Sequence, residues 1–411
     1  MNKASRDQLI EIAQDVLGHA DAKTFRTADS TMTLPASMYT DPRRFHDERM
    51  KLFRRVPLML AASCELRHAG DYKTMDVAGV PILLTRDRSG VAHALLNVCT
   101  HRGAPVASGV GNAARFVCPY HGWTYANDGA LAAVASAKDF GEIDKDCFAL
   151  RRLPIHERHG LVWVTIDPEA GLDADQFLGD FGEALGGFGF ESWHLVERRE
   201  LPGANWKLAF DAHLEFYHLP VLHRNTFGPT TSNRALYFFD GPHERLIRPI
   251  GLEKPGINPD ADIFQWRDRP VTDWPVEAML LGEWILFPNV SINSFYTGGR
   301  GVLISQILPG ATVGESITIQ SYYMQNEPDA EQLAAVRANC EFLARVVRDE
   351  DLANSYNQQQ ALGSGLLKEV CFGRNEGGGQ HFHRWLDAVL ATPDAALMGL
   401  FADQSDQLRD A

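Results

Sequence analysis

Two short stretches of the chain each place a cysteine beside a histidine. They read Cys99-x-His101 and Cys118-x-x-His121, and a glycine closely follows each pair. Zinc fingers place Cys with Cys and His with His, whereas each stretch here mixes the two residue types. The mixture fits a two-iron, two-sulfide cluster in which two thiolates bind one iron and two imidazoles bind the other, because each loop must then reach both irons. We therefore predict a [2Fe–2S] cluster with these four ligands.

A second group of metal-ligand residues lies in residues 205–223. Histidines stand at His213, His218 and His223, and open iron sites that activate O2 use two histidines and one carboxylate. Residues five apart lie about 140° apart around an ideal helix, so two of them share a metal only where the helix breaks. We expect a helix over 204–222 that Pro220 breaks between the last two histidines. This predicts His218 and His223 as ligands and His213 as a packing or hydrogen-bonding residue.

The third ligand is predicted from a long helix over 330–362. Its apolar residues step by three or four positions and form one stripe, namely Leu333, Val336, Cys340, Leu343 and Val347. The next member of the stripe is Asp351, whereas Asp349 falls on the opposite side and Glu350 on the flank. A carboxylate that faces a core is costly unless it binds a metal or a cation. Asp351 is therefore the candidate ligand, and an ion pair with a core-facing arginine is the alternative.

The pattern along the chain predicts an α+β protein with three segments. Residues 1–38 are predicted as a helical arm that packs on the last segment, and 39–166 as a small β domain with the cluster loops at one end. Strand-like runs occur at 73–77, 80–85, 91–98 and 161–166, with glycine-containing turns between the earlier ones. Residues 167–411 are predicted as the iron domain, with a hairpin of long strands at 301–308 and 316–325.

Composition limits the class of partner. The chain has 411 residues, a net charge of −14 and 45% hydrophobic residues, which argues against nucleic-acid binding and describes a globular protein. We find neither an apolar run long enough to cross a membrane nor a signal peptide. Six cysteines are too few for a disulfide framework in so long a chain, so we expect a reducing cytoplasm. The four that are not assigned to the cluster are expected to be small buried residues: Cys64, Cys147, Cys340 and Cys371.

The source of electrons is predicted to be a separate protein. Residues 109–114 fit the pattern G-x-G-x-x-A, but they lead into a strand-like run and not into a helix, so we interpret them as a turn. Residues 41–120 hold 12 Lys and Arg against 7 Asp and Glu. This basic region is either a solvated face or a docking surface for an acidic electron carrier.

Together, the motifs resemble the α subunits of the Rieske non-haem iron oxygenases over nearly the whole chain. The resemblance rests on Cys-x-His-Arg-Gly, Cys-Pro-Tyr-His-Gly-Trp, Asn-Trp-Lys, Glu-x-Tyr-His-x4-His and a late helix with Asp. It implies a β-rich Rieske domain and a helix-grip (START-like) catalytic domain with an antiparallel sheet and a long C-terminal helix. It also implies a head-to-tail homotrimer, or a multiple of trimers.

The resemblance also assigns roles to residues. It implies that the cluster ligands are Cys99, His101, Cys118 and His121, and that the ligands of the mononuclear iron are His218, His223 and Asp351. Glu215 matches the carboxylate that links a Rieske histidine to an iron-bound histidine across a subunit interface. Many relatives have Asp at that position, and Glu is found among members that oxidise quaternary ammonium compounds. Asp211 stands where the family often has Asn, so a contact near the iron is replaced or lost.

The implied function is that of a terminal oxygenase. It uses O2 and electrons that come from NAD(P)H through a reductase, with or without a ferredoxin, to hydroxylate or demethylate a small quaternary ammonium or aromatic substrate. Dihydroxylation of an aromatic ring is one alternative, and an electron carrier or redox sensor without catalytic iron is another. Aromatic residues between 227 and 296 either line a pocket, cage a cation or form core: Tyr237, Phe238, Phe239, Trp266, Trp274, Trp284, Phe287 and Phe295.

Overall fold

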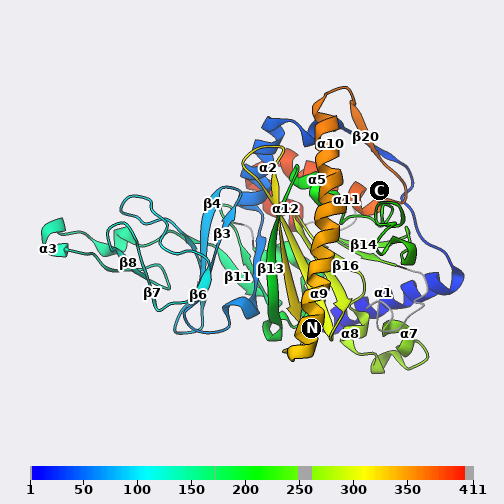
Figure 1. Ribbon diagram of the computed structural model, residues 1–411, viewed down its shortest axis with the longest axis horizontal. Coiled ribbons are helices and arrows are strands. Elements are labelled where there is room, and N and C mark those ends of the chain that lie inside the picture. The colour runs from blue at the N-terminus through cyan, green and yellow to red at the C-terminus, as the bar shows by residue number, and fades with distance from the viewer. Residues whose placement is uncertain (1, 172, 249–261, 403–411) are drawn as a thin grey trace.

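The chain folds into a β-rich first part, whose strands lie within residues 58–164, and a larger second part built around one antiparallel sheet (Figure 1). The computed structural model describes residues 2–171, 173–248 and 262–402. The boundaries predicted between the segments stay predictions, and the outermost residues of the predicted ranges, 1 and 403–411, lie outside the described residues.

Three small sheets make up the first part. The five-stranded sheet has the order β10-β5-β4-β3-β6 and comprises β3 (Asp71–Val77), β4 (Val80–Arg86), β5 (Ala92–Leu96), β6 (Val110–Asn112) and β10 (Arg152–Leu153). The second has the order β11-β12-β2, with β2 at Leu58–Ala62, β11 at Ile155–Arg158 and β12 at Leu161–Val164. The third, β7-β8-β9, comprises Arg115–Val117, Thr124–Ala126 and Leu131–Ala133. The strands predicted in this part are confirmed as β3, β4, β5 and β12.

A seven-stranded antiparallel sheet forms the centre of the second part. Its order is β13-β19-β18-β17-β16-β15-β14. The strands are β13 (His194–Gly203), β14 (Leu236–Asp240), β15 (His243–Ile247), β16 (Glu283–Leu286), β17 (Val290–Tyr296), β18 (Arg300–Pro309) and β19 (Ser316–Met324). The predicted hairpin is confirmed as β18 and β19, which pair from Gly301 with Met324 to Pro309 with Ser316.

Helices cover both faces of this sheet. The α-helices of the described residues are α1 (Lys3–Ala22), α2 (Pro42–Arg55), α3 (Ala137–Phe140), α4 (Ala174–Leu185), α5 (Trp206–Asp211), α6 (Leu219–Leu222), α7 (Asp262–Trp266), α8 (Val276–Met279), α9 (Ala330–Val346), α10 (Ala353–Gly363), α11 (Gly377–Ala391) and α12 (Leu397–Ala402). Of these, α3 lies away from the sheet, at the far end of the first part (Figure 1). The face that carries Trp284 meets Phe181 of α4, with ring centroids 5.1 Å apart. The opposite face meets α9, where the Tyr322 hydroxyl donates to the carbonyl of Cys340 at 3.3 Å.

The N-terminal arm lies along the second part. Helix α1 contacts α4 and α8, and strand β1 (Met32–Pro35) pairs with β20 (Glu369–Phe372) near the other end of the chain. Figure 1 shows α1 as the blue helix beneath the sheet, far from the first part's small sheets. These contacts support the arm's predicted position.

Buried ion pairs join elements that are distant in sequence. Glu65 accepts hydrogen bonds from Lys73 Nζ at 3.0 Å and Tyr323 Oη at 2.6 Å, and it pairs with Arg198. Burial opposes the charge of Glu65, but Lys73 and Arg198 outweigh it and lower the pKa of its carboxyl to about 2. Because Lys73 belongs to β3, Arg198 to β13 and Tyr323 to β19, this carboxylate links the two parts.

The structure corrects two predictions about local structure. The helix predicted over 204–222 is two short helices, α5 and α6, separated by a non-helical segment. Of the four cysteines expected to be buried, only Cys340 is fully buried, Cys64 is half-buried, and Cys147 and Cys371 are exposed. In the described part of the chain, no helix is long and apolar enough to cross a bilayer.

Candidate functional site

The two cysteine–histidine loops have the same turn geometry. The backbone N–H of Gly103 donates to the carbonyl of Cys99 at 2.9 Å, and that of Gly122 donates to Cys118 at 3.0 Å. Both glycines have positive φ, 83° and 68°, a conformation that a residue with a Cβ adopts only at a cost. The glycines behind each pair are therefore required by the turns that present the ligands.

The cysteines are buried and the histidines lie towards solvent. Cys99 and Cys118 are each 2% exposed, whereas His101 is half-buried and His121 is exposed. The two imidazole rings lie side by side with centroids 4.7 Å apart, and His101 stacks on Trp123 at 4.9 Å. Buried thiolates with two neighbouring imidazoles at the surface fit the donor set of a Rieske cluster, whose histidine-bound iron is the outer one.

Tyr125 is a residue near the cluster that the motif search missed. Its hydroxyl lies 3.2 Å from Cys99 Sγ and accepts from the backbone N–H of Thr100 at 3.1 Å. Burial and the neighbouring Cys99 raise the pKa of Tyr125 to about 12, so the hydroxyl stays protonated and can donate to a thiolate. Burial would raise the pKa of Cys99, but hydrogen bonds from Tyr125 and from backbone N–H groups lower it overall.

The histidines of the second group are positioned by one short turn of helix. Helix α5 ends at Asp211, and α6 begins at Leu219 with His218 before it and His223 after it. Pro220 lies in the first turn of α6, where a missing N–H costs little, so it does not break a helix there. The break lies between His213 and His218, contrary to our expectation. The predicted pair of histidines does meet, but by a different local structure.

The third residue of the group comes from a π-helical turn. Helices α9 and α10 are joined by Val347–Leu352, in which the helix widens by one residue per turn. Asp351 Oδ1 lies 3.3 Å from His223 Nε2 and 3.7 Å from His218 Nε2. One ligand atom from each of the three residues lies within 4.8 Å of the others. Two imidazole nitrogens and a carboxylate converging on one point fit the donor set of a mononuclear non-haem iron.

Each imidazole of this group is held by a second carboxylate. His218 Nδ1 donates to Glu215, and His223 Nδ1 donates to Glu350 Oε2 at 2.7 Å. A carboxylate on Nδ1 fixes the ring orientation and leaves Nε2 free to bind a metal. The sequence predicted the contact of Glu215 but placed Glu350 on the flank of the helix. The prediction assumed the spacing of an α-helix, in which residues 350 and 351 point in different directions, and so it missed Glu350. The π-helical turn brings both residues to the same site.

The histidine pair lies in a negative environment. Burial would lower the pKa of His218, but its hydrogen bond to Glu215 and the charges of Glu215 and Asp351 raise it overall. Burial likewise opposes the charge of His223, and Asp351 and Glu350 raise the pKa of its imidazole. A divalent cation bound by the imidazoles would replace their protons and gain the same favourable interactions.

Asp211 and His213 contact the surroundings of this group and not the group itself. Asp211 accepts from the Tyr39 hydroxyl at 2.6 Å and from His383 Nε2 at 2.9 Å. His213 Nδ1 lies 3.0 Å from Glu283 Oε1, which fits its predicted role as a hydrogen-bonding residue. Asp211 therefore connects the end of α5 to Tyr39, directly after the arm, and to His383 of α11.

The sheet face behind the histidine loop carries buried carboxylates. Glu283 accepts from Ser291 at 2.5 Å and from His213, and neighbouring Glu244 is 1% exposed. Within the described residues, neither carboxylate oxygen of Glu244 has a hydrogen-bond partner. Burial and the charge of Glu283 raise the pKa of Glu244 well above its ordinary value. A Cβ on Gly378 of α11 would lie 2.8 Å from Glu244, so this glycine permits close approach.

Two family models match the chain in the positions of these sites. The model of the Rieske [2Fe-2S] domain matches residues 56–148, which contain both cysteine–histidine loops. The model of the ring hydroxylating alpha subunit (catalytic domain) matches residues 190–392, which contain the histidine pair and Asp351.

Similar proteins of known activity are oxygenase components. The carnitine monooxygenase oxygenase subunit of Escherichia coli (strain K12) is 29% identical over 375 residues, which cover 87% of this chain and 93% of that protein. The chloroplastic choline monooxygenase of Spinacia oleracea is 33% identical over 198 residues, 47% of this chain and 45% of that protein.

A crystal structure shows the same fold. The quaternary ammonium Rieske monooxygenase CntA, in complex with an inhibitor, has a TM-score of 0.73 at 23% identity, covering 87% of this chain and 95% of that one. The chain is therefore the α subunit of a Rieske non-haem iron oxygenase, an oxidoreductase that uses O2, electrons from a reductase, a Rieske [2Fe–2S] cluster and a non-haem iron to oxidise a small organic substrate.

Proposed function

We propose that the chain is a mono-oxygenase of a small ammonium compound. Its substrate would be hydroxylated at a carbon attached to nitrogen, after which the carbon–nitrogen bond breaks to give an amine and a carbonyl compound. The hydroxylation consumes one O2, two electrons and two protons and releases one water. The similarity to the carnitine monooxygenase subunit, which extends over 87% of the chain, is the observation that carries this proposal.

The buried carboxylates beside the histidine loop support a cationic substrate. Glu283 contacts His213. Helix α11 packs closely on Leu214 and Glu244, because a Cβ on its Gly378 would clash with the Leu214 carbonyl oxygen and would lie 2.8 Å from Glu244. An ammonium group nearby would favour the charged form of Glu244, whose pKa is raised by burial and by Glu283, whereas an apolar ring would leave this buried carboxyl without a partner. Glu215, the residue that resembles the quaternary ammonium members, lies in the same loop.

Three of the aromatic residues considered as a cage for a cation are part of the buried core. Trp284, Phe287 and Trp274 are 0%, 1% and 3% exposed, and the guanidinium of Arg245 lies 4.1 Å from the Trp284 ring centroid. Trp284 therefore already pairs with a cation of the protein. A cage for the substrate would have to use other rings, of which Tyr237 is half-buried and near Glu215.

We propose the metal ligands from the donor sets described above. The cluster would be held by Cys99, His101, Cys118 and His121, and the iron by His218, His223 and Asp351. Bound there, the iron supplies O2 activation and the cluster supplies electrons one at a time. The chain itself orients the imidazoles through Glu215 and Glu350. In this proposal, Glu215 also accepts a hydrogen bond from a cluster histidine of a neighbouring subunit.

We propose a head-to-tail trimer for the oligomer. Exposed apolar side chains border the cluster loops, with Tyr120 and Phe140 55% and 45% exposed, and others border the histidine pair, with Tyr217 and Val221 52% and 67% exposed. Figure 1 shows the cluster end, marked by α3 and β8, far to one side of α5 and α10. A contact between two different surfaces is heterologous, and it gives a ring such as a trimer when the rotation between subunits closes. Light scattering on the holoenzyme tests this, and a monomer or a two-fold dimer would contradict it.

The substrate proposal is tested by turnover with a surrogate reductase. The holoenzyme, NADH and the reductase are given a panel of N-methylated ammonium compounds and a panel of aromatic acids, and O2 uptake and product are measured together. We expect amine and carbonyl products from the ammonium panel only. Glu283→Gln should raise KM for that substrate while iron content stays unchanged. Formation of a cis-diol from an aromatic acid would replace this proposal by ring dihydroxylation. A cytoplasmic location and the use of a ferredoxin stay predictions.

A further inference from the structure

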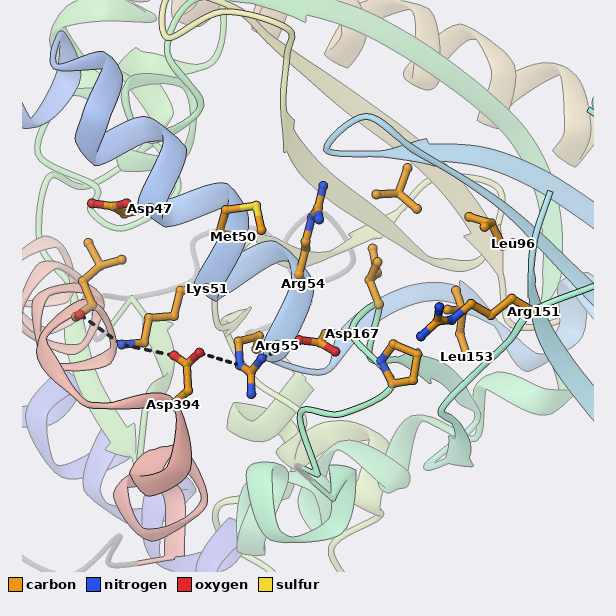
Figure 2. A pocket seen from close by; sticks show the side chains of 14 residues that line it. Asp47, Met50, Lys51, Arg54, Arg55, Leu96, Arg151, Leu153, Asp167 and Asp394 are labelled. Atoms are coloured by element: carbon orange, nitrogen blue, oxygen red, sulfur yellow. Dashed lines mark hydrogen bonds and ion pairs between the residues drawn. The ribbon is translucent and has the colours of Figure 1, made fainter. Parts of the chain in front are cut away.

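A pocket of about 640 Å³ lies where the first part of the chain meets helix α2 (Figure 2). One side is formed by α2 and by the segment after α11, and the other by strands β4, β5 and β10 and the linker after β12. None of the proposed ligands of the cluster or the iron lines it. A pocket of this size is within the range that holds a small molecule.

Four basic side chains line the pocket, and two of them are already paired. Lys51 donates to the carbonyl of Leu390 at 3.1 Å and lies 3.7 Å from Asp394. Arg55 pairs with Asp167 and lies 3.5 Å from Asp394. Asp167 and Asp394, the two carboxylates inside the pocket, are therefore already paired and do not offset the charge of a further basic side chain.

Arg54 and Arg151 are the other two basic side chains. Among the described residues, neither guanidinium forms a hydrogen bond or an ion pair, and Arg54 Nε is buried without a partner. Figure 2 shows both side chains lying apart from the Lys51–Asp394–Arg55 pairs. The third carboxylate of the lining, Asp47, is exposed and lies two helical turns before Arg54. Arg54 is half-buried, whereas Arg151 is exposed. A half-buried guanidinium without an anion, such as that of Arg54, is unusual in a protein with a net charge of −14.

The rest of the lining is apolar. It is made by Met50, Val80, Leu96, Leu153, Ile166 and Leu390. Two guanidinium groups above an apolar wall match a molecule with an anionic head and an apolar body, because arginine binds carboxylate and phosphate through paired hydrogen bonds. Inorganic anions would leave the apolar wall unused.

An electron-carrier protein fits this pocket less well. Electron transfer requires the donor to approach the cluster, and Figure 1 shows the cluster end, marked by β8 and α3, far from α2. The proposed substrate carries a positive charge and is therefore not matched to two unpaired arginines. The pocket is thus distinct in place and in charge from the oxygenase site.

We propose that this pocket is a binding site for a small organic anion, a carboxylate or phosphate with an apolar body, held by Arg54 and Arg151. Arg54 belongs to α2, and Arg151 precedes β10, so one ligand would contact two elements on either side of the junction. The flank of α2 carries Glu48, which accepts from Lys207 Nζ at 2.6 Å and so holds the start of α5. Helix α2 therefore stands between this pocket and the helix that leads to the histidine pair.

Calorimetric titration of the holoenzyme tests the proposal with octanoate, phenyl phosphate, inorganic phosphate and octanamide. We expect octanoate or phenyl phosphate to bind once per chain and octanamide not to bind. Inorganic phosphate should bind at least about tenfold more weakly than the organic anion, because it makes no apolar contact. Equal affinity for inorganic phosphate, or binding of octanamide, would overturn the class of ligand.

Single substitutions locate the site. Arg54→Gln and Arg151→Gln should each weaken binding of the organic anion at least about tenfold, since each removes a charge-assisted hydrogen bond. Arg88→Gln, at an exposed arginine in the turn between β4 and β5, is the matched control and should bind like the unchanged chain. The cluster's visible absorption verifies that each variant is folded. Absence of saturable binding, or the same affinity in all three variants, would refute the site.

Discussion

The imidazole of His223 lies between two carboxylates that are adjacent in sequence. Its Nδ1 is 2.7 Å from Glu350 Oε2, and its Nε2 is 3.3 Å from Asp351 Oδ1. An ordinary α-helix turns about 100° per residue, so neighbouring side chains point in different directions. The π-helical turn Val347–Leu352 permits both to reach one ring, and π-helical turns of this kind are frequent at functional sites.

Removal of the Glu350 carboxylate is expected to weaken iron binding. In Glu350→Gln, the ring of His223 loses the acceptor that orients it, and such contacts typically contribute about 10-fold to 100-fold to metal affinity. The measurement is iron retained per chain against increasing chelator. Asp349→Asn is the control, because Asp349 is exposed and pairs only with the neighbouring Arg348 among the described residues. Equal loss of iron in both variants would contradict the role of Glu350.

Substitution of Asp351 should separate the two metal centres. Asp351→Ala removes one of the three proposed iron ligands and leaves the cysteine–histidine loops unchanged, so the cluster's visible absorption should persist while turnover falls below detection. Metal analysis should show about two irons per chain in place of three. Loss of the cluster absorption as well would show that Asp351 supports the fold and is not a ligand.

Glu215 is expected to matter for electron arrival even when the iron site is full, so the variant is loaded with excess iron before it is measured. Glu215→Gln keeps the size of the side chain but removes the charge that holds Nδ1 of His218. A single-turnover experiment with pre-reduced clusters should show oxidation of the cluster by O2 and substrate slowed by at least about tenfold, with three irons still present. An unchanged rate would exclude Glu215 as the link between the centres.

Tyr125 should tune the cluster. Tyr125→Phe removes the hydroxyl that lies 3.2 Å from Cys99 Sγ. Hydrogen bonds to sulfur stabilise the more negative, reduced cluster, so the reduction potential should fall in the variant. Redox titration followed by visible absorption measures this. Phe148 packs on Trp123 with ring centroids 5.5 Å apart and offers a control as Phe148→Leu; a similar shift there would point to a packing effect.

Glu65 should make the junction of the two parts sensitive to acid. The pKa of its carboxyl in the folded protein is about 2, below the ordinary value of 4.5, so its stabilising effect is present above about pH 4.5 and is lost as the pH falls towards 2. Glu65→Gln should cost about 3 kcal/mol at pH 7, because Lys73 stays buried without its partner. Denaturant unfolding of the holoenzyme measures this.

The control for that experiment is an exposed ion pair. Arg158 and Asp175 are each about half exposed, so Arg158→Gln should change the free energy of unfolding by less than about 1 kcal/mol. In Glu65→Gln, the dependence of stability on pH between about 4.5 and 2 should also be reduced. A variant with unchanged stability and unchanged pH dependence would rule out a role for Glu65 at the junction.

Features that depend on a few neighbouring residues could be predicted from the sequence alone. The cysteine–histidine loops could be found because each turn needs its two ligand residues and a glycine within a short segment, as Gly103 and Gly122 show. The strands β3, β4, β18 and β19 and the apolar stripe that leads to Asp351 could also be predicted, since burial on one face leaves a regular pattern.

Features that depend on contacts across the chain could not be predicted from the sequence. The break after Asp211 is stabilised by Tyr39, directly after the arm, and by His383 of α11, so a local pattern of helix-forming residues did not reveal it. Glu350 reaches His223 through a π-helical turn that has no marked signal in the sequence. Ligand types are chosen by chemistry and are visible in the sequence, whereas the orientation of those ligands comes from side chains that pack against them from distant elements.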